Sequence, residues 1–290
     1  MEESIEKLIE RCEQEIASTQ DAQKKAEQVA VIKDLWRKYR GEDQIVSVED
    51  YLKRIANEES GDELVVMSKI PKLDIIIEGF REGNLVVVSG ATKQGKTSFC
   101  QTLTENFSEQ GVKCLWFTYE VPVKEFTRKF KEIPTFYLPN KITGDTTDWL
   151  EKKTVEAIAK YGVRVVFVDH LHYIVDLRAM KQNLSVQIGM VMRDLKKIAL
   201  AWGVIIFLVA HIKKTKASDM PGLDDMRDSS FVAQEADIVM MVSRLIQEGS
   251  EFSNEAIVSV LAHRRTGKMG SVRLLYRDNK FNQVAVEYEK

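Results

Sequence analysis

The sequence predicts an α/β protein built on a doubly wound, mainly parallel sheet, with a C-terminal antiparallel extension and a short helical N-terminal segment. Three observations indicate this class. Short apolar runs alternate with helical patterns between residues 63 and 237, a glycine-rich loop joins one run to a helical stretch, and strand patterns follow one another from residue 238. We therefore expect a helical segment over residues 1–60 and one α/β domain over residues 63–290.

Residues 1–60 are rich in Glu, Lys, Gln and Ala, and apolar residues of one helical stripe recur from Ile5 to Ile16. A second helix is expected over 22–39. Ser47 and Asp50 have the spacing of a helix cap and predict a further helix over 48–57. An apolar stripe of this kind needs a partner. The partner is either the chain's own α/β domain or a neighbouring subunit.

Residues 90–97 read Gly-Ala-Thr-Lys-Gln-Gly-Lys-Thr, which matches the phosphate-binding loop G-x-x-x-x-G-K-[ST]. An apolar run precedes the motif and a helical pattern follows it, as the motif requires. Gly90 and Gly95 allow successive N–H groups to face an anion, and the helix N-terminus adds positive potential. The alternative is a glycine turn that binds no nucleotide.

This motif predicts a site for ATP and Mg²⁺ in which Lys96 reaches the β- and γ-phosphates and the Thr97 hydroxyl holds Mg²⁺. The residues expected to contact the nucleotide are Gly90, Ala91, Thr92, Lys93, Gln94, Gly95, Lys96, Thr97 and Ser98.

The other elements of the α/β domain follow from hydrophobic periodicity and from glycine stops. Helices are expected at 98–111, 124–131, 148–161 and 184–202. Strands are expected at 84–89, 113–119, 135–138, 163–171, 204–212, 238–245, 256–264, 271–277 and 284–289. Thr146 or Thr147 starts the helix at 148–161 and Gly162 ends it, while Asp278 and Asn279 form the turn of a terminal hairpin.

Polar residues end three of the apolar strands, and the carboxyl ends of parallel strands lie beside the phosphate loop. Asp169 is expected to hold Mg²⁺ through water. Glu120 is placed to polarise the water that attacks the γ-phosphate. His211 is placed to sense the γ-phosphate. The alternatives are a turn aspartate, a solvated glutamate and a histidine that only satisfies a strand end.

Basic residues gather at two further places. Two loops that follow strands at the same sheet edge carry Arg178 and Lys181, and Lys213, Lys214 and Lys216. These are either a solvated face or a local anion-binding patch. Arg265 follows a late strand, from which it reaches a neighbour's γ-phosphate more easily than its own, unless the segment is only a basic hairpin rim.

Bulk composition narrows the class of protein. Of the 290 residues, 44% are hydrophobic and 30% are charged, and the net charge is −2, so any nucleic-acid contact must come from a local patch. Three scattered cysteines fit neither a disulfide framework nor a zinc site. The N-terminus lacks a signal-peptide layout and no apolar run reaches membrane-spanning length, so a cytoplasmic protein with no membrane contact is expected.

From about residue 68 to residue 290, the order of these parts resembles the RecA-like core of DnaB-type replicative helicases. The segments that carry the resemblance begin at Ile70 (Ile-Pro-Lys-Leu-Asp), Val86 (the strand and phosphate loop), Trp116 (Trp-Phe-Thr-Tyr-Glu-Val-Pro), Phe167 (Phe-Val-Asp-His-Leu), Val209 (Val-Ala-His), Met226 (Met-Arg-Asp-Ser-Ser), Gln234 (Gln-Glu-Ala-Asp) and Ala262 (Ala-His-Arg-Arg-Thr-Gly).

The resemblance implies an ATP-hydrolysing helicase that forms a ring hexamer, with nucleotide at subunit interfaces and single-stranded DNA in the channel. By position, Glu120 matches the catalytic glutamate, Asp169 the Walker B aspartate and Arg265 the arginine finger. The two basic loops match the loops that bind DNA in the channel. Primase or other replication proteins are the further partners that this resemblance implies.

The chain departs from the family pattern at two histidines and in its N-terminal region. His211 stands where glutamine is usual, and His263 stands where a phosphate-contacting lysine is usual. The N-terminal region is short for the usual collar and linker, so we expect a phage-like, organellar-like, plasmid-borne or otherwise divergent member. A RecA-like recombinase or KaiC-like switch, and an ATP-assembled loader that is not a motor, are the alternatives.

Overall fold

The computed structural model describes residues 14, 47–50, 52, 64–171, 174, 184–211, 234–246 and 252–284. The chain divides into two units after residue 62, and each is described by itself. In the first unit, the Ser47 hydroxyl accepts a hydrogen bond from the Asp50 N–H at 3.0 Å and donates one to the Asp50 carboxylate at 2.6 Å. The predicted cap is therefore confirmed, while most of the predicted N-terminal helices lie outside the described residues.

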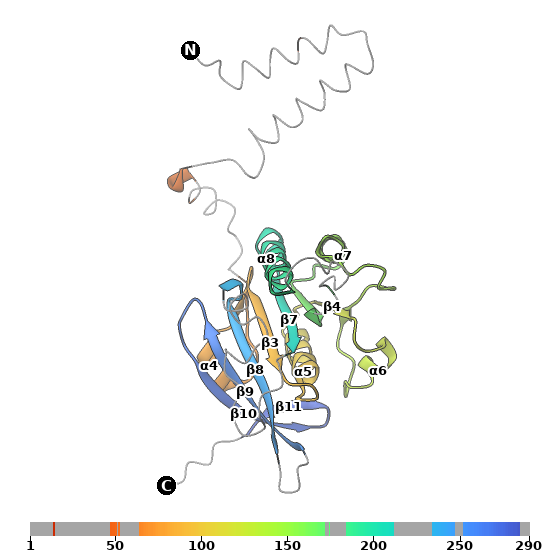
Figure 1. Ribbon diagram of the computed structural model, residues 1–290, viewed down its shortest axis with the longest axis vertical. Coiled ribbons are helices and arrows are strands. Elements are labelled where there is room, and N and C mark those ends of the chain that lie inside the picture. Colours follow the sequence, from red (N-terminus) through yellow and green to blue (C-terminus); the bar gives the residue numbers. More distant parts are fainter. Residues whose placement is uncertain are drawn as a thin grey trace. The chain divides into compact units, whose positions relative to one another are not determined.

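The described part of the second unit is organised around one nine-stranded sheet in the order β11-β10-β9-β8-β3-β7-β6-β4-β5 (Figure 1). Its strands are β3 (Leu85–Gly90), β4 (Cys114–Thr118), β5 (Phe136–Tyr137), β6 (Val165–Asp169), β7 (Ile205–His211), β8 (Ile238–Ile246), β9 (Phe252–His263), β10 (Gly270–Arg277) and β11 (Lys280–Gln283). Neighbours from β8 through β5 pair in parallel, and β8 to β11 pair antiparallel. The mixed sheet confirms the predicted fold class. A separate ribbon pairs β1 (Val65–Val66) with β2 (Phe80–Arg81).

Helices cover both faces of this sheet. The helices are α4 (Pro71–Ile77), α5 (Lys96–Ser108), α6 (Val123–Thr127), α7 (Thr147–Tyr161) and α8 (Leu184–Trp202). Side chains of α4, α5 and α6 share one buried cluster with one face of the sheet, and side chains of α7 and α8 share a second cluster with the other face. None of the helices that the structure describes combines the length and apolar composition needed to cross a bilayer.

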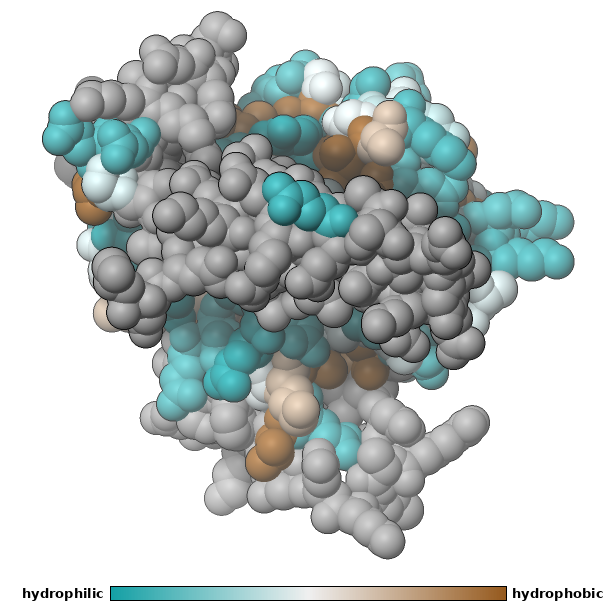
Figure 2. All heavy atoms as spheres, turned by 90° about the horizontal axis from the view of Figure 1, so that it is seen from above, coloured by the Kyte–Doolittle hydropathy of each residue, from teal (hydrophilic) through white to brown (hydrophobic). Residues whose placement is uncertain are grey.

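The central strands are apolar on both faces because helices exclude water from each side. Trp116 of β4 stacks on Phe167 of β6 with ring centroids 4.5 Å apart, and Phe167 stacks on Phe207 of β7 at 4.8 Å. These rings fix the relative positions of three strands whose carboxyl ends reach the phosphate loop. On the face seen in Figure 2, hydrophilic residues form most of the coloured surface, with smaller apolar areas between them.

The predicted caps of α7 are present. The Thr146 hydroxyl accepts a hydrogen bond from the Trp149 N–H at 3.2 Å, and Gly162 ends the helix in the left-handed region with φ of 68°. Glycine is favoured there because a Cβ makes that conformation costly.

Three observed elements begin or end four residues from the predicted position. One is β9, which begins at Phe252 rather than at the predicted residue 256. The terminal hairpin does turn at Asp278 and Asn279, which have φ of 55° and 64°. Because this is a two-residue turn, Lys280 pairs directly with Arg277, and β11 begins four residues before the strand predicted over 284–289, of which residues 285–289 lie outside the described residues. The helix α6 ends at Thr127 rather than at the predicted residue 131.

Candidate nucleotide-binding site

The phosphate loop runs from the end of β3 into α5. Its two glycines exclude a side chain for different structural reasons. Gly90 has φ of 152°, and a Cβ there would clash with the backbone carbonyl of Val242 on the neighbouring strand β8. Gly95 has φ of 91°, and its missing Cβ leaves room for the ring of Phe281, which would lie only 3.2 Å away. Both positions therefore need glycine for local packing as well as for the loop conformation.

The C-terminal strands brace the loop and its helix. The Gln94 side-chain oxygen accepts a hydrogen bond from the backbone N–H of Arg244 on β8. The Phe281 N–H of β11 donates to the Thr102 hydroxyl of α5 at 3.0 Å. These contacts join residues more than 140 positions apart, and periodicity within each segment carries no signal for them.

Lys96 is almost fully buried at the start of α5. Its ammonium group donates hydrogen bonds to the carbonyl oxygens of Gly90 and Ala91, both at 2.9 Å. Burial lowers the pKa of Lys96 to about 8, although the negative charges of Asp169 and Glu120 oppose the shift. The lysine therefore sits inside the curve of the loop, next to the groups that would bind a phosphate.

Asp169 ends β6 and is 1% exposed. Its Oδ2 accepts a hydrogen bond from the Thr97 hydroxyl at 2.8 Å, while Oδ1 is buried with no hydrogen-bond partner among the described residues. Burial raises the pKa of Asp169 to about 6, and the Thr97 hydrogen bond opposes this rise. A hydroxyl beside a carboxylate with a free buried oxygen is an all-oxygen set that fits Mg²⁺.

Glu120 lies at the same edge of the sheet because Thr118, the last residue of β4, pairs with Asp169. Oxygen or nitrogen ligand atoms of Glu120, Asp169 and His170 all lie within 4.8 Å of one another. His170 Nδ1 is 3.4 Å from Glu120 Oε2. The sequence prediction did not assign a role to His170, although its place directly after a strand-end aspartate was a usable signal.

His211 is the last residue of β7, and its backbone pairs with Gly90 in the parallel ladder. The predicted neighbourhood of His211 and the phosphate loop is therefore present in the backbone, while its side chain lies outside the described atoms. The five predicted DNA-contacting residues, Arg178, Lys181, Lys213, Lys214 and Lys216, also lie outside the described residues.

Arg265 lies at the opposite end of the parallel strands from the phosphate loop, which follows their carboxyl ends. His263 at the end of β9 pairs with Ile238 at the start of β8, and Ile238 pairs with Val86 near the start of β3. At about 3.3 Å per residue, the four residues from Val86 to Gly90 separate the two edges by about 13 Å along the strands. Arg265 is therefore not brought together with Lys96, Glu120 and Asp169 within one chain.

His263 has a structural role in this turn. Its Nδ1 accepts a hydrogen bond from the Thr266 N–H at 3.3 Å, so Nε2 carries the proton and donates to the Ile77 carbonyl at 3.0 Å. The side chain is buried. His263 thus ties the Arg265 turn to the end of α4 and has no nitrogen left for a phosphate.

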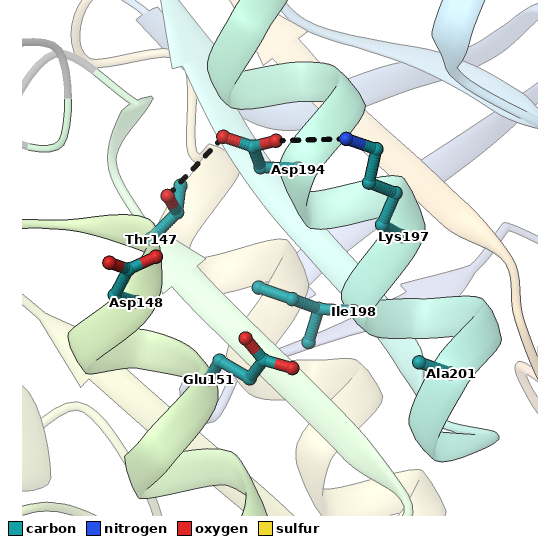
Figure 3. A pocket seen from close by; sticks show the side chains of 7 residues that line it. All are labelled: Thr147, Asp148, Glu151, Asp194, Lys197, Ile198 and Ala201. Atoms are coloured by element: carbon teal, nitrogen blue, oxygen red, sulfur yellow. Dashed lines mark hydrogen bonds and ion pairs between the residues drawn. The ribbon is translucent and has the colours of Figure 1, made fainter. Parts of the chain in front are cut away.

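A pocket of 240 Å³ lies elsewhere, between α7 and α8. Figure 3 shows its lining, in which Asp194 accepts a hydrogen bond from Thr147 and forms an ion pair with Lys197. The residues that line it are Thr147, Asp148, Glu151, Asp194, Lys197, Ile198 and Ala201. It contains none of the predicted site residues.

A family model described as DnaB-like helicase C-terminal domain matches residues 128–284, more than half of the chain. The chain belongs to this family. A second model, described as KaiC, matches residues 66–135, which include the phosphate loop and Glu120. Together the two models cover residues 66–284.

Curated relatives that match this chain are named as replicative helicases. The probable replicative DNA helicase of Trieres chinensis is 21% identical over 246 residues, covering 71% of this chain and 54% of that protein. The replicative DNA helicase DnaC of Bacillus subtilis is 22% identical over 276 residues, covering 82% of this chain and 61% of that protein. The chain therefore spans little more than half the length of these relatives.

Solved structures show the same RecA-like fold. One solved ATPase domain matches with a TM-score of 0.70 at 22% identity, covering 83% of this chain and all of that domain. A DnaB-like replicative helicase, studied with its primase interactions, matches with a TM-score of 0.70 at 20% identity, covering 97% of this chain and 76% of that chain.

Proposed function

We propose that this chain is an ATP-hydrolysing motor of the replicative helicase class, which moves on single-stranded DNA and separates duplex at replication forks. One observation carries the proposal. Thr97, Asp169 and Glu120 come together beside a complete phosphate loop, in a chain of the DnaB-like family. The relatives named replicative helicases support the same function.

The chemistry follows from the charges and donors at this edge. The N–H groups of the loop and the N-terminus of α5 bind the phosphates, and Lys96 neutralises them. Thr97 and Asp169 would hold Mg²⁺, which would supply charge neutralisation at the phosphates. Glu120 polarises the attacking water, because its carboxylate lies next to Asp169 and faces solvent.

We further propose a ring homo-hexamer in which Arg265 reaches the nucleotide of the adjacent subunit. The opposite placement of Arg265 and the phosphate loop supports an interface site, since an arginine at the far edge meets a triphosphate only across a subunit boundary. His211, by its backbone position beside Gly90, would pass nucleotide state into the loop that follows β7. The N-terminal segment over 1–60 is proposed to dock on a neighbouring subunit.

Single-stranded DNA is proposed to bind the loops carrying Arg178, Lys181, Lys213, Lys214 and Lys216. Each loop follows a strand, β6 or β7, that ends at the nucleotide edge. Primase is a proposed further partner, since a structural neighbour is described through its interactions with primase. A cytoplasmic location is proposed on the ground of the replicative helicases among the relatives of this chain.

A second candidate function is a KaiC-like switch or an ATP-assembled loader. The KaiC model covers the phosphate loop and Glu120, which such proteins would share. The antiparallel C-terminal strands and the Arg265 turn fall within the DnaB-like model, which favours the motor. Hydrolysis that does not respond to DNA would favour the switch.

ATP binding is expected to take up a proton and to weaken as the pH rises above about 8. In the free chain, burial lowers the pKa of Lys96 to about 8, so above this pH the side chain is mostly neutral. Bound phosphates raise that pKa, so binding at pH 8.5 takes up about three quarters of a proton. Calorimetry in two buffers of different ionisation enthalpy measures the uptake. Lys96→Arg stays charged and should show none; equal uptake in both proteins would contradict the assignment.

Changing Lys213, Lys214 and Lys216 together to alanine is expected to weaken single-strand binding and to flatten its salt dependence. Each lost phosphate contact reduces the logarithmic salt slope by roughly 0.7 on single strands. Stimulation of ATP hydrolysis by DNA should disappear, while basal hydrolysis should remain because the nucleotide edge is untouched. Fluorescence anisotropy over a range of salt concentrations measures the slope.

The matched control replaces three other lysines, Lys113, Lys141 and Lys152, which lie outside both loops. This variant carries the same charge change and should keep the wild-type salt slope. If the loop variant and the control bind alike, the loop lysines are a solvated face and the DNA path lies elsewhere.

A further inference from the structure

We propose that Glu78 is a positioning residue that orients Arg265 toward the nucleotide of the adjacent subunit. The proposal rests on the proposed function, in which Arg265 acts across a subunit interface. It assigns a role to a carboxylate that belongs to none of the motifs of the nucleotide edge.

The Glu78 carboxylate binds both cations of the Arg265 turn. Its Oε2 accepts a hydrogen bond from Arg265 Nη2 at 2.8 Å, and its Oε1 accepts one from Lys268 Nζ at 2.6 Å. Each oxygen thus binds one cation. The two cations, Arg265 and Lys268, flank Thr266 and Gly267 in the turn. This arrangement fixes where the guanidinium lies relative to the sheet edge.

The position of Glu78 is itself set by the end of α4. Glu78 caps the helix in the left-handed region with φ of 55°, and its N–H donates to the Asp74 carbonyl at 2.8 Å. The preceding residue, Ile77, accepts the hydrogen bond from His263 at 3.0 Å. The side chains of His263, Arg265 and Lys268 are therefore anchored on the consecutive residues Ile77 and Glu78 at the end of α4. The negative end of the helix dipole also attracts cations to this position.

The contact leaves Arg265 able to bind a phosphate. Among the described residues, Arg265 uses only Nη2 toward Glu78, and a guanidinium has five N–H donors in a planar fork. The Arg265 side chain is 44% exposed, so a group outside the chain can approach it. The two cations hold the pKa of Glu78 down at about 2, so the carboxylate stays charged at any working pH.

Orientation, rather than folding stability, is the expected contribution of Glu78. Half-exposed ion pairs contribute little to stability because solvent screens them. A catalytic group that loses its support moves away from the reacting atoms, and such a displacement typically costs roughly 10- to 100-fold in rate.

The test measures steady-state ATP hydrolysis of the assembled protein with single-stranded DNA. Glu78→Ala is expected to lower kcat roughly 10- to 100-fold with an unchanged KM for ATP, and Glu78→Gln, which keeps the side-chain volume, is expected to lower it less. The matched control is Glu109→Gln, because Glu109 also binds two lysines, Lys69 and Lys280, each at 3.2 Å. This control should keep the wild-type kcat, and equal thermal unfolding of all three variants shows that the fold is intact.

Two further readouts separate positioning from a general structural effect. Adding Glu78→Ala to Arg265→Ala should cause no further loss, because Glu78 acts through Arg265. Mixing Glu78→Ala chains with Lys96→Ala chains should restore hydrolysis, because the Lys96→Ala chain supplies a well-oriented arginine to its neighbour's intact loop.

A wild-type kcat in Glu78→Ala, or a loss that adds to that of Arg265→Ala, would overturn the role of Glu78 while leaving the proposed function in place. An Arg265→Ala protein with normal hydrolysis would overturn both the role of Glu78 and the interface site on which it rests.

Discussion

Arg265→Ala is expected to slow ATP hydrolysis by about 10³-fold or more, the contribution typical of an arginine that stabilises the transferring phosphoryl group. Nucleotide binding to the phosphate loop should persist, because Arg265 lies at the other edge of the sheet from Gly90. The measurement is single-turnover hydrolysis at saturating ATP, with ATP affinity determined separately by calorimetry.

Mixing experiments decide whether Arg265 acts across an interface. A Lys96→Ala chain has a damaged loop and an intact arginine, and an Arg265→Ala chain has the reverse. In an equal mixture of exchanging subunits, about a quarter of the interfaces combine an intact loop with an intact arginine. Hydrolysis should therefore exceed that of either variant alone. Mixtures that never exceed the separate variants under proven exchange would exclude action in trans.

Glu120→Gln is expected to bind ATP normally and to hydrolyse it about 10²- to 10⁴-fold more slowly, since the amide cannot accept the proton of the attacking water. Lys96→Ala should instead lose affinity for ATP, because it removes the buried cation of the loop. Glu125→Gln on α6 carries the same chemical change away from the cluster of ligand atoms and serves as the control. Normal turnover in Glu120→Gln would remove Glu120 from the catalytic role.

The nucleotide edge was predictable because its parts are local in sequence. A strand, a loop and a helix lie within residues 85–108, and parallel topology alone brings strand-end residues such as Asp169 to the same edge. The hydrogen bond from Thr97 to Asp169 joins two residues that were each predicted to serve Mg²⁺.

Contacts between distant segments were not predictable in this way. Glu78 meets Arg265 across 187 positions, and nothing in the apolar periodicity of either segment signals that contact. Phe281 packs beside Gly95 across 186 positions, and the pattern of neither segment signals that packing. Tertiary packing, rather than local propensity, sets these features.

His263 shows how a departure from a family pattern acquires a physical explanation. The sequence indicated only that a phosphate-contacting lysine is replaced. The buried imidazole uses both nitrogens within the chain, so it supports the turn that presents Arg265.

Strand separation on a forked DNA duplex tests the central claim most directly. The wild-type protein, supplied with ATP and Mg²⁺, is expected to release the labelled strand, and Glu120→Gln is expected to bind the fork without releasing it. DNA-stimulated hydrolysis by the wild-type protein with no strand release on any fork would contradict a helicase motor. That result would instead support an ATP-driven switch or loader.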